Sequence, residues 1–225
     1  MYAGIYNAAS AMDMAERRHE LTAHNLAAAN IPGFRRRIDI GQAGEQQAET
    51  RIDFAQGGLQ QTGRPLDVAL VGEGFFTVQA PDGSSFYTRA GDWFLSAEGD
   101  LTTVDGLPVL AGGRPVRLPQ TASENDLQIS ETGELRIGEQ SLGTLDIVSF
   151  EDTSGLQPVG HTLFQASPET APTFSTARVQ QGVRELSNVS IPLELVRMLA
   201  GVRNYEAAQR AMQSLTKSIA QRVEN

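Results

Sequence analysis

The sequence predicts an α+β protein in which a central all-β domain, meander or barrel-like, lies between N- and C-terminal helices that pair as a coiled-coil-like inner domain. Three observations lead to this fold class. Both ends place apolar residues at helical spacing, the centre consists of short β-branched and aromatic runs, and glycine separates those runs every six to nine residues. We expect a discontinuous helical domain at residues 1–34 and 187–225, a connector at 35–56 and a β-rich domain at 57–186.

The first predicted element is a helix over residues 5–29, which contain neither proline nor glycine. Its apolar positions on one seven-residue track are Ile5, Met12 and Leu26. Ala8, Ala15 and Thr22 flank this track, which is typical of an amphipathic helix with a small-residue seam. The Asn-Ile-Pro-Gly stretch at 30–33 ends the helix, because asparagine tolerates the left-handed C-terminal position and proline cannot continue the hydrogen-bond ladder.

The central region is predicted to be a succession of hairpins. Asp82-Gly83 and Asp105-Gly106 have the composition of tight turns, because those turns require positive φ. The runs at 75–78 and 85–88 are therefore expected to pair as strands around the first of these turns. A second strand-rich stretch at 127–164 contains no pattern that requires a helix.

The last predicted element is a long helix with one apolar stripe at three- and four-residue spacing. The stripe consists of Leu195, Met198, Val202, Tyr205, Ala208, Met212, Leu215, Ile219 and Val223. Ser190 is a suitable N-cap, and Pro192 falls in the first turn, where its missing donor costs little. Two apolar faces at opposite ends of one chain can be buried only on each other or on neighbouring subunits, so the pattern predicts self-assembly.

The composition limits the partners of the chain. Residues 1–40 carry five basic and four acidic side chains, residues 186–225 carry five and three, and residues 41–185 carry eight and twenty. The net charge of −9 therefore belongs to the middle, which argues against nucleic-acid binding and predicts nearly neutral ends that can pack together. The chain has no cysteine, and its start lacks the pattern of a cleaved signal peptide. Without an apolar run of roughly 18 residues, we expect no membrane span.

Three patterns that could support chemistry are better explained by structure. His19 and His24 are five positions apart, so their rings diverge by roughly 140° on a helix and do not share one metal. Gly72-Glu73-Gly74 lacks the third glycine and the following helix of a dinucleotide site. The central acids, among them Asp92, Glu98, Asp100 and Asp105, neighbour turn glycines, and nothing places two of them across a cleft. We therefore predict a non-enzymatic chain without metal or cofactor.

A set of motifs resembles one protein family. The stretch His-Asn-Leu-Ala-Ala-Ala-Asn-Ile-Pro-Gly-Phe-Arg at 24–35 resembles the N-terminal signature of the bacterial flagellar basal-body rod and hook proteins. Further blocks similar to the family pattern follow in order within residues 56–59, 66–76, 87–110 and 181–206. The chain departs from the pattern at His24, Arg184 and Gly201.

The resemblance implies a structural subunit of the flagellar rod, which polymerises helically through its terminal helices and transmits motor torque to the hook. Its partners would be itself, other axial proteins and the flagellar type III export apparatus, which passes such proteins to the periplasmic rod without a cleaved signal. Only 22 residues separate Phe34 from Gly57, which favours a rod subunit over the larger hook protein. The position along the rod stays open. The rival hypothesis is a periplasmic β-domain protein that binds or acts on peptidoglycan or another carbohydrate.

The resemblance and the helical faces together suggest where subunits meet. The residues expected to take part in assembly are Ile5, Met12, Asn25, Leu26, Asn30, Gly33, Phe34, Asn188, Leu195, Met198, Val202, Tyr205, Met212, Leu215 and Ile219. Two alternatives remain for some of them. Asn25 and Asn30 could be local helix caps, and the track of Met198, Tyr205 and Met212 could be an intramolecular core.

Overall fold

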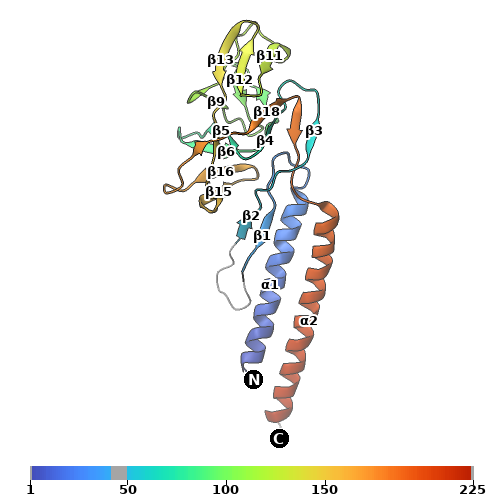
Figure 1. The fold of residues 1–225 in the computed structure, drawn as a ribbon. Coiled ribbons are helices and arrows are strands. Elements are labelled where there is room, and N and C mark those ends of the chain that lie inside the picture. Colours follow the sequence, from blue (N-terminus) through green and yellow to red (C-terminus); the bar gives the residue numbers. More distant parts are fainter. Residues whose placement is uncertain (1, 42–49, 224–225) are drawn as a thin grey trace. The chain divides into compact units, whose positions relative to one another are not determined.

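The computed structural model of the chain describes residues 2–41 and 50–223. The chain forms two compact units, each built from segments that are distant in the sequence. The helical unit consists of Met1–Ala29, Arg36–Asp53 and Val189–Asn225, and the β unit of Asn30–Arg35 and Phe54–Asn188. The predicted α+β class is confirmed, with one helix near each end of the chain and strands between them (Figure 1).

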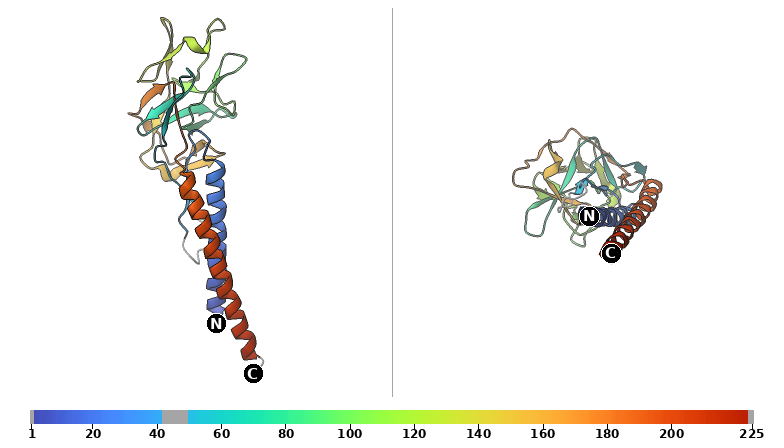
Figure 2. Two further views of the ribbon diagram at one scale, coloured as in Figure 1. Left: turned by 90° about the vertical axis from the view of Figure 1, so that its right-hand side faces the viewer. Right: turned by 90° about the horizontal axis from the view of Figure 1, so that it is seen from below.

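The helical unit contains α1 (Tyr2–Ala27), β1 (Arg37–Asp39), β2 (Thr50–Ile52) and α2 (Ile191–Val223). The two helices lie side by side in opposite directions, as Figures 1 and 2 show. Ala8, Ala15 and Thr22 of α1 are buried, so the small-residue seam predicted from the sequence is present. The first helical backbone bond of α2, from the Glu194 N–H to the Ser190 carbonyl, places Ser190 at the predicted N-cap position.

Seventeen strands and two short 3₁₀ helices (Glu124–Asp126 and Thr153–Gly155) make up the regular structure of the β unit. The strands are β3 (Leu59–Gln61), β4 (Val68–Val71), β5 (Phe75–Gln79), β6 (Ser85–Thr88), β7 (Phe94–Leu95), β8 (Leu101–Thr102), β9 (Leu110–Ala111), β10 (Arg114–Pro115), β11 (Leu127–Ile129), β12 (Glu134–Ile137), β13 (Gln140–Thr144), β14 (Ile147–Ser149), β15 (Leu156–Val159), β16 (Leu163–Ala166), β17 (Thr173–Phe174), β18 (Arg178–Gln181) and β19 (Val183–Glu185).

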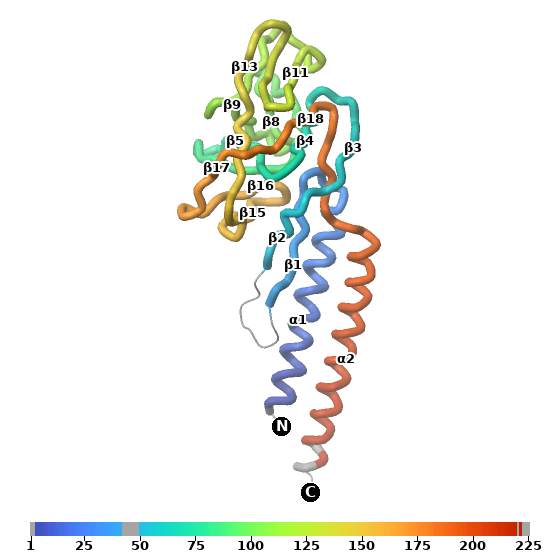
Figure 3. Tube along the Cα trace, viewed as in Figure 1, coloured from blue at the N-terminus to red at the C-terminus, as the bar shows by residue number. Residues whose placement is uncertain are grey.

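The largest sheet has the strand order β15-β16-β6-β5-β14-β17. Within the described residues its two edge strands do not pair with each other, so the β unit contains no closed barrel. β11, β12 and β13 form a second antiparallel sheet, and β3–β19, β4–β18, β7–β8 and β9–β10 are two-stranded pairs. The trace in Figure 3 shows that β3, from the start of this unit, lies beside the chain segment near its end.

The hairpins expected from the sequence are present. β5 and β6 pair from Phe76↔Thr88 to Gln79↔Ser85, and Gly83 in the turn between them has φ +85°. Gly106 has φ +79°, as the second predicted turn requires. The strands enclose an apolar core in which the fully buried Trp93 meets Phe76 edge to face, with ring centroids 4.9 Å apart. In the described part of the chain, neither helix has the apolar length that crossing a bilayer demands.

Candidate subunit-assembly site

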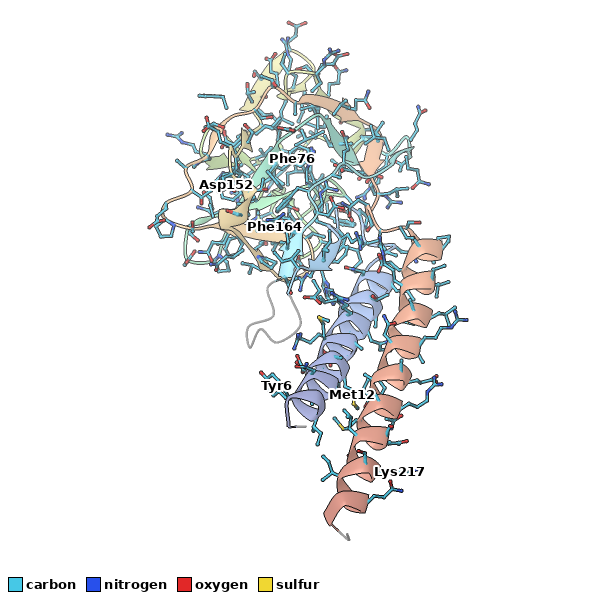
Figure 4. All side chains as sticks on the ribbon, turned by 60° about the horizontal axis from the view of Figure 1, so that its bottom comes forward. Tyr6, Met12, Phe76, Asp152, Phe164 and Lys217 are labelled. Carbon is cyan, nitrogen blue, oxygen red and sulfur yellow. The ribbon has the colours of Figure 1, made fainter. Side chains whose placement is uncertain are left out.

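The helix α2 carries two apolar faces, and the first of them packs on α1. At the far end of the pair, a Cβ atom on Gly4 would lie 3.2 Å from Cδ1 of Leu215, so the two backbones approach closely there. Met198, Met212 and Ile219 on the same face of α2 are half-buried. In Figure 4, Met12 lies between the two helices, whereas Tyr6 projects from the side of α1 away from α2. This seam occupies part of the stripe that the sequence predicted.

The second apolar face of α2 is exposed and lies in the first third of the helix. Its residues are Ile191, Leu195, Val196, Leu199 and Val202, of which Val196 and Leu199 expose 61% and 63% of their surface. They recur at three- and four-residue intervals, so they form one continuous patch on the helix surface. Single exposed apolar residues need no explanation, but a contiguous patch of this kind marks an interaction surface.

The sequence prediction missed three members of this face, Ile191, Val196 and Leu199. A single stripe centred on Leu195, Val202 and their heptad neighbours leaves them on its flank. The available signal was the apolar content of residues 191–202, which exceeds what one seam against α1 requires. Tyr205, which was predicted, lies at the border of the two faces and is 37% exposed.

Two polar contacts connect the helix pair to β1 and to the residue before it, at the end of the pair where α1 finishes and α2 begins. Asn25 is buried, and its side-chain amide donates to the Arg37 carbonyl at 2.8 Å and accepts from the Arg37 N–H at 2.9 Å. Glu194 is also buried and accepts from Arg36 Nε at 2.7 Å and from Arg197. The position of Glu194 in the first turn of α2 adds a favourable interaction with the helix dipole. The Glu194 contact fixes the first turn of α2 relative to β1, and the exposed face of α2 begins in that turn.

A buried ionic cluster lies inside the β unit. Arg35 donates to Oε1 of Glu185 at 2.6 Å, and both side chains are completely buried. The Gly57 N–H also donates to Oε1, at 2.9 Å, and Nε of Arg89 lies 3.8 Å from Oε2. Burial lowers the pKa of Arg89 to about 10, since two guanidinium groups share one carboxylate away from water. The cluster therefore joins residues that precede β3, follow β6 and end β19.

Gly33 lies beside this cluster, and its backbone position explains the residue type. Its N–H donates to the Glu185 carbonyl at 2.9 Å, and its φ of +69° belongs to the left-handed region. A Cβ atom at Gly33 would lie 2.4 Å from the Ala90 nitrogen, which no side chain tolerates. Phe34 next to it is fully buried. Gly33 and Phe34 thus serve the fold of the β unit.

The remaining residues expected in assembly have mixed surroundings. Ile5 and Leu26 are half-buried on α1, Asn30 is exposed, and Asn188 donates from its side chain to the Ala55 carbonyl at 3.0 Å. The structure thus places Leu195, Val202 and Tyr205 at the surface, and Asn25, Gly33 and Phe34 inside their own units. Participation of these residues in contacts between subunits stays a prediction.

The groups considered for chemistry have structural surroundings. Asp100 accepts from Nε and Nη2 of Arg117 at 2.6 and 2.7 Å, and these bonds lower its pKa. Burial raises the pKa of Asp92, which pairs through its backbone with Asp67. Over residues 2–41 and 50–223, no group of three or more histidine, cysteine, aspartate or glutamate side chains is placed to hold a metal ion.

Comparison with known proteins identifies the family. The family model described as "Flagellar hook protein FlgE/F/G D1 domain" matches residues 69–137, and that described as "Flagellar basal body rod FlgEFG protein C-terminal" matches residues 180–221. The flagellar basal-body rod protein FlgG of Agrobacterium fabrum is 32% identical over 241 residues, covering 88% of this chain and 90% of the relative. FlgG of Borreliella burgdorferi is 28% identical with 95% of both chains covered, and FlgF of Escherichia coli is 30% identical with 94% of this chain and 93% of the relative covered. The chain therefore belongs to the flagellar basal-body rod and hook protein family.

Proposed function

We propose that this chain is a structural subunit of the flagellar basal-body rod and that it polymerises through its helical unit. The observation that carries the proposal is the second apolar face of α2, which remains exposed after α1 has covered the first. A helix that packs on one neighbour needs one stripe, so a second stripe is the mark of a helix that meets another chain. The relatives are named as flagellar basal-body rod proteins, so the other chain would be a neighbouring subunit of the rod.

The charge distribution supports contact through the helices. The nearly neutral terminal segments can approach their copies without strong repulsion, whereas segments 41–185 carry twelve more acidic than basic side chains (twenty against eight). Like charges on facing surfaces oppose association. Contact through the helical units brings the nearly neutral segments together, and the charge of the acidic segment favours solubility.

The partners follow from this role. We infer that neighbouring copies and other axial proteins of the flagellum contact the helical unit, and that the polymer carries torque from the motor to the hook within the periplasmic space. Export would proceed through the flagellar type III apparatus. A rigid helix pair braced by the Asn25–Arg37 and Arg36–Glu194 contacts suits a subunit that bears mechanical load.

The rival hypothesis, a β-domain protein that binds or acts on carbohydrate, is tested by a direct assay. Purified protein should release no soluble fragments from peptidoglycan and should not co-sediment with it. Hydrolysis that persists through purification would overturn the structural role.

The test of the assembly proposal is Leu195→Asp, which places a charge in the middle of the exposed face of α2. In a strain that lacks its own copy, the variant should be exported yet fail to form rods, so that basal bodies are incomplete and swimming stops. The matched control is Ala211→Asp, an exposed position roughly 160° from Leu195 around the same helix. Complete basal bodies with Leu195→Asp would contradict the proposed interface.

A further inference from the structure

A cavity of about 250 Å³ opens on the helical unit between α1 and α2. It is lined by Ala15, Glu16, His19, Gly201, Val202 and Tyr205. An apolar cavity of ~150 Å³ already accommodates benzene, so this one has room for a branched aliphatic side chain. We call it the Gly201 socket. Two of the lining residues are small. They are Ala15 of α1, which is buried, and Gly201 of α2, which has no side chain.

The backbone conformation does not explain why residue 201 is a glycine. Gly201 lies inside α2 and is absent from the glycines with positive φ, so any residue could adopt its conformation. A Cβ atom placed on it would meet no heavy atom within 4 Å. Glycine destabilises a helix interior relative to alanine, and here the fold gains nothing in return. The gain must come from the space itself, which implies that something else fills it.

The chain also carries side chains shaped to fill such a space. Among the large apolar side chains of α2 that the structure describes, Leu199 and Val196 are the most exposed. They lie roughly 160° and 140° from Gly201 around the helix, so they point away from the socket of their own chain. Val202 in the socket wall lies only about 60° from Leu199, but the Leu199 side chain projects past that wall, and a projection and a pocket that face different directions on one helix cannot meet within one chain. Between copies they form a head-to-tail contact, which continues indefinitely unless the rotation closes a ring.

From this geometry we propose that the Gly201 socket of one copy receives the Leu199 side chain of a second copy. The inference rests on the proposed function and specifies its contact: a knob and a hole that repeat from subunit to subunit with one polarity. The occupant is another copy because the terminal segments are nearly neutral and the same helix supplies both halves of the contact. Tyr205 and Val202 form the wall of the socket nearest the surface and would close over the inserted side chain.

Cross-linking tests the polarity of the contact. The chain contains no cysteine, so single cysteines introduced at chosen positions are the only reactive thiols. Cells should co-express Leu199→Cys and Tyr205→Cys copies, and isolated rods should be treated with a short bis-maleimide. We expect the mixed pair to give dimers at least ten times more abundant than either variant alone. The matched control, Leu199→Cys with Ala207→Cys, should stay at background.

Each outcome decides between the proposals. Equal dimer yield from Leu199→Cys alone would show a symmetric contact and overturn the inference. Background yield in rods that have assembled would overturn the inference and leave the rod function standing. If the unsubstituted protein forms no rods, the proposed rod function and the inference about the Gly201 socket are both wrong.

A filled socket gives an independent test. Gly201→Leu replaces a helix-destabilising glycine with a strong helix former and places a side chain into the open space, so the helix content of the isolated chain should not fall and should rise in mild helix-promoting conditions. Assembly should nevertheless fall at least tenfold, because the hole for Leu199 is occupied. Gly201→Ala, which fills little of the cavity, should stabilise the chain and preserve assembly. Undiminished assembly with Gly201→Leu would overturn the inference, and so would equal loss with both variants.

Discussion

The buried cluster around Glu185 allows one prediction to be worked out in detail. Glu185→Gln keeps the size of the side chain and the oxygen that accepts from Gly57, but it removes the charge that offsets Arg35 and Arg89. Removal of one partner from a fully buried ion pair costs about 3–5 kcal/mol. We expect a value near the lower end, about 3 kcal/mol, because the hydrogen bond from Gly57 is retained.

The measurement is urea unfolding of the full chain followed by tryptophan fluorescence. Trp93 is the only tryptophan and is fully buried in the β unit, so it reports the unit that contains the cluster. With a slope of about 2 kcal/mol per molar urea, the loss lowers the midpoint by roughly 1.5 M. Glu134→Gln is the matched control, since Glu134 lies 4.0 Å from Arg136 in an exposed pair and its loss should cost less than about 0.5 kcal/mol.

The pH dependence has a definite sign. Burial lowers the pKa of Arg89 from its ordinary value to about 10 in the folded chain, and the Glu185 charge keeps it from falling further. Between those values the unfolded state binds more protons, so the Arg89 contribution favours the folded state as pH rises. In Glu185→Gln this window begins at lower pH, and the destabilisation should shrink as pH is raised from 7 toward 10. If Glu185→Gln lowers the free energy of unfolding by less than about 1 kcal/mol at pH 7, or by an amount that grows with pH, the charge of Glu185 does not stabilise the cluster.

Three further predictions concern the helices and the acidic residues. Tyr205→Asp should block rod assembly without changing Trp93 fluorescence, because an unpaired carboxylate buried in a contact costs several kcal/mol; normal motility would contradict this. Burial raises the pKa of Asp92, so Asp92→Asn should match the unsubstituted chain near pH 3, be at least as stable at pH 7 in urea titrations, and leave motility intact. In dilute monomer, limited proteolysis should remove residues 1–34 and 187–225 before the β unit, as helix formation coupled to assembly requires; equal resistance of ends and centre would exclude that coupling.

The elements that the sequence predicted well are those specified locally. The helix α1 and the long helix α2 follow from apolar spacing and from the prolines near their ends, and the β5–β6 hairpin follows from Asp82-Gly83. Each signal lies within about a dozen neighbouring residues, where side-chain periodicity and turn chemistry decide the conformation. Pairing of α1 with α2 was also expected, because two apolar stripes can be buried only on each other or on neighbouring subunits, and the structure adds that the two helices run in opposite directions.

The features that the sequence did not predict depend on contacts between distant residues. Arg35 stands at the start of a polar stretch that was expected to be a connector, yet it is completely buried because Glu185, 150 positions away, accepts its hydrogen bond. The same stretch contains β1, which Asn25 holds through the Arg37 backbone. A charged residue looks solvated in a sequence whenever its partner is remote. The Gly201 socket was missed for a related reason, since a cavity belongs to two helices together.

The pairing of β3 with β19 and of β4 with β18 has a consequence for how the chain acquires its structure. The first two strands of the β unit find their partners more than 100 residues later, so they remain unpaired while the intervening hairpins form. Contacts of such separation are slow to form because loop closure precedes any gain from pairing. A chain that emerges end first, from a ribosome or through a pore, cannot close this unit until residue 185 is free. The β unit can therefore be completed only after residue 185 has emerged, and α2 follows it along the chain.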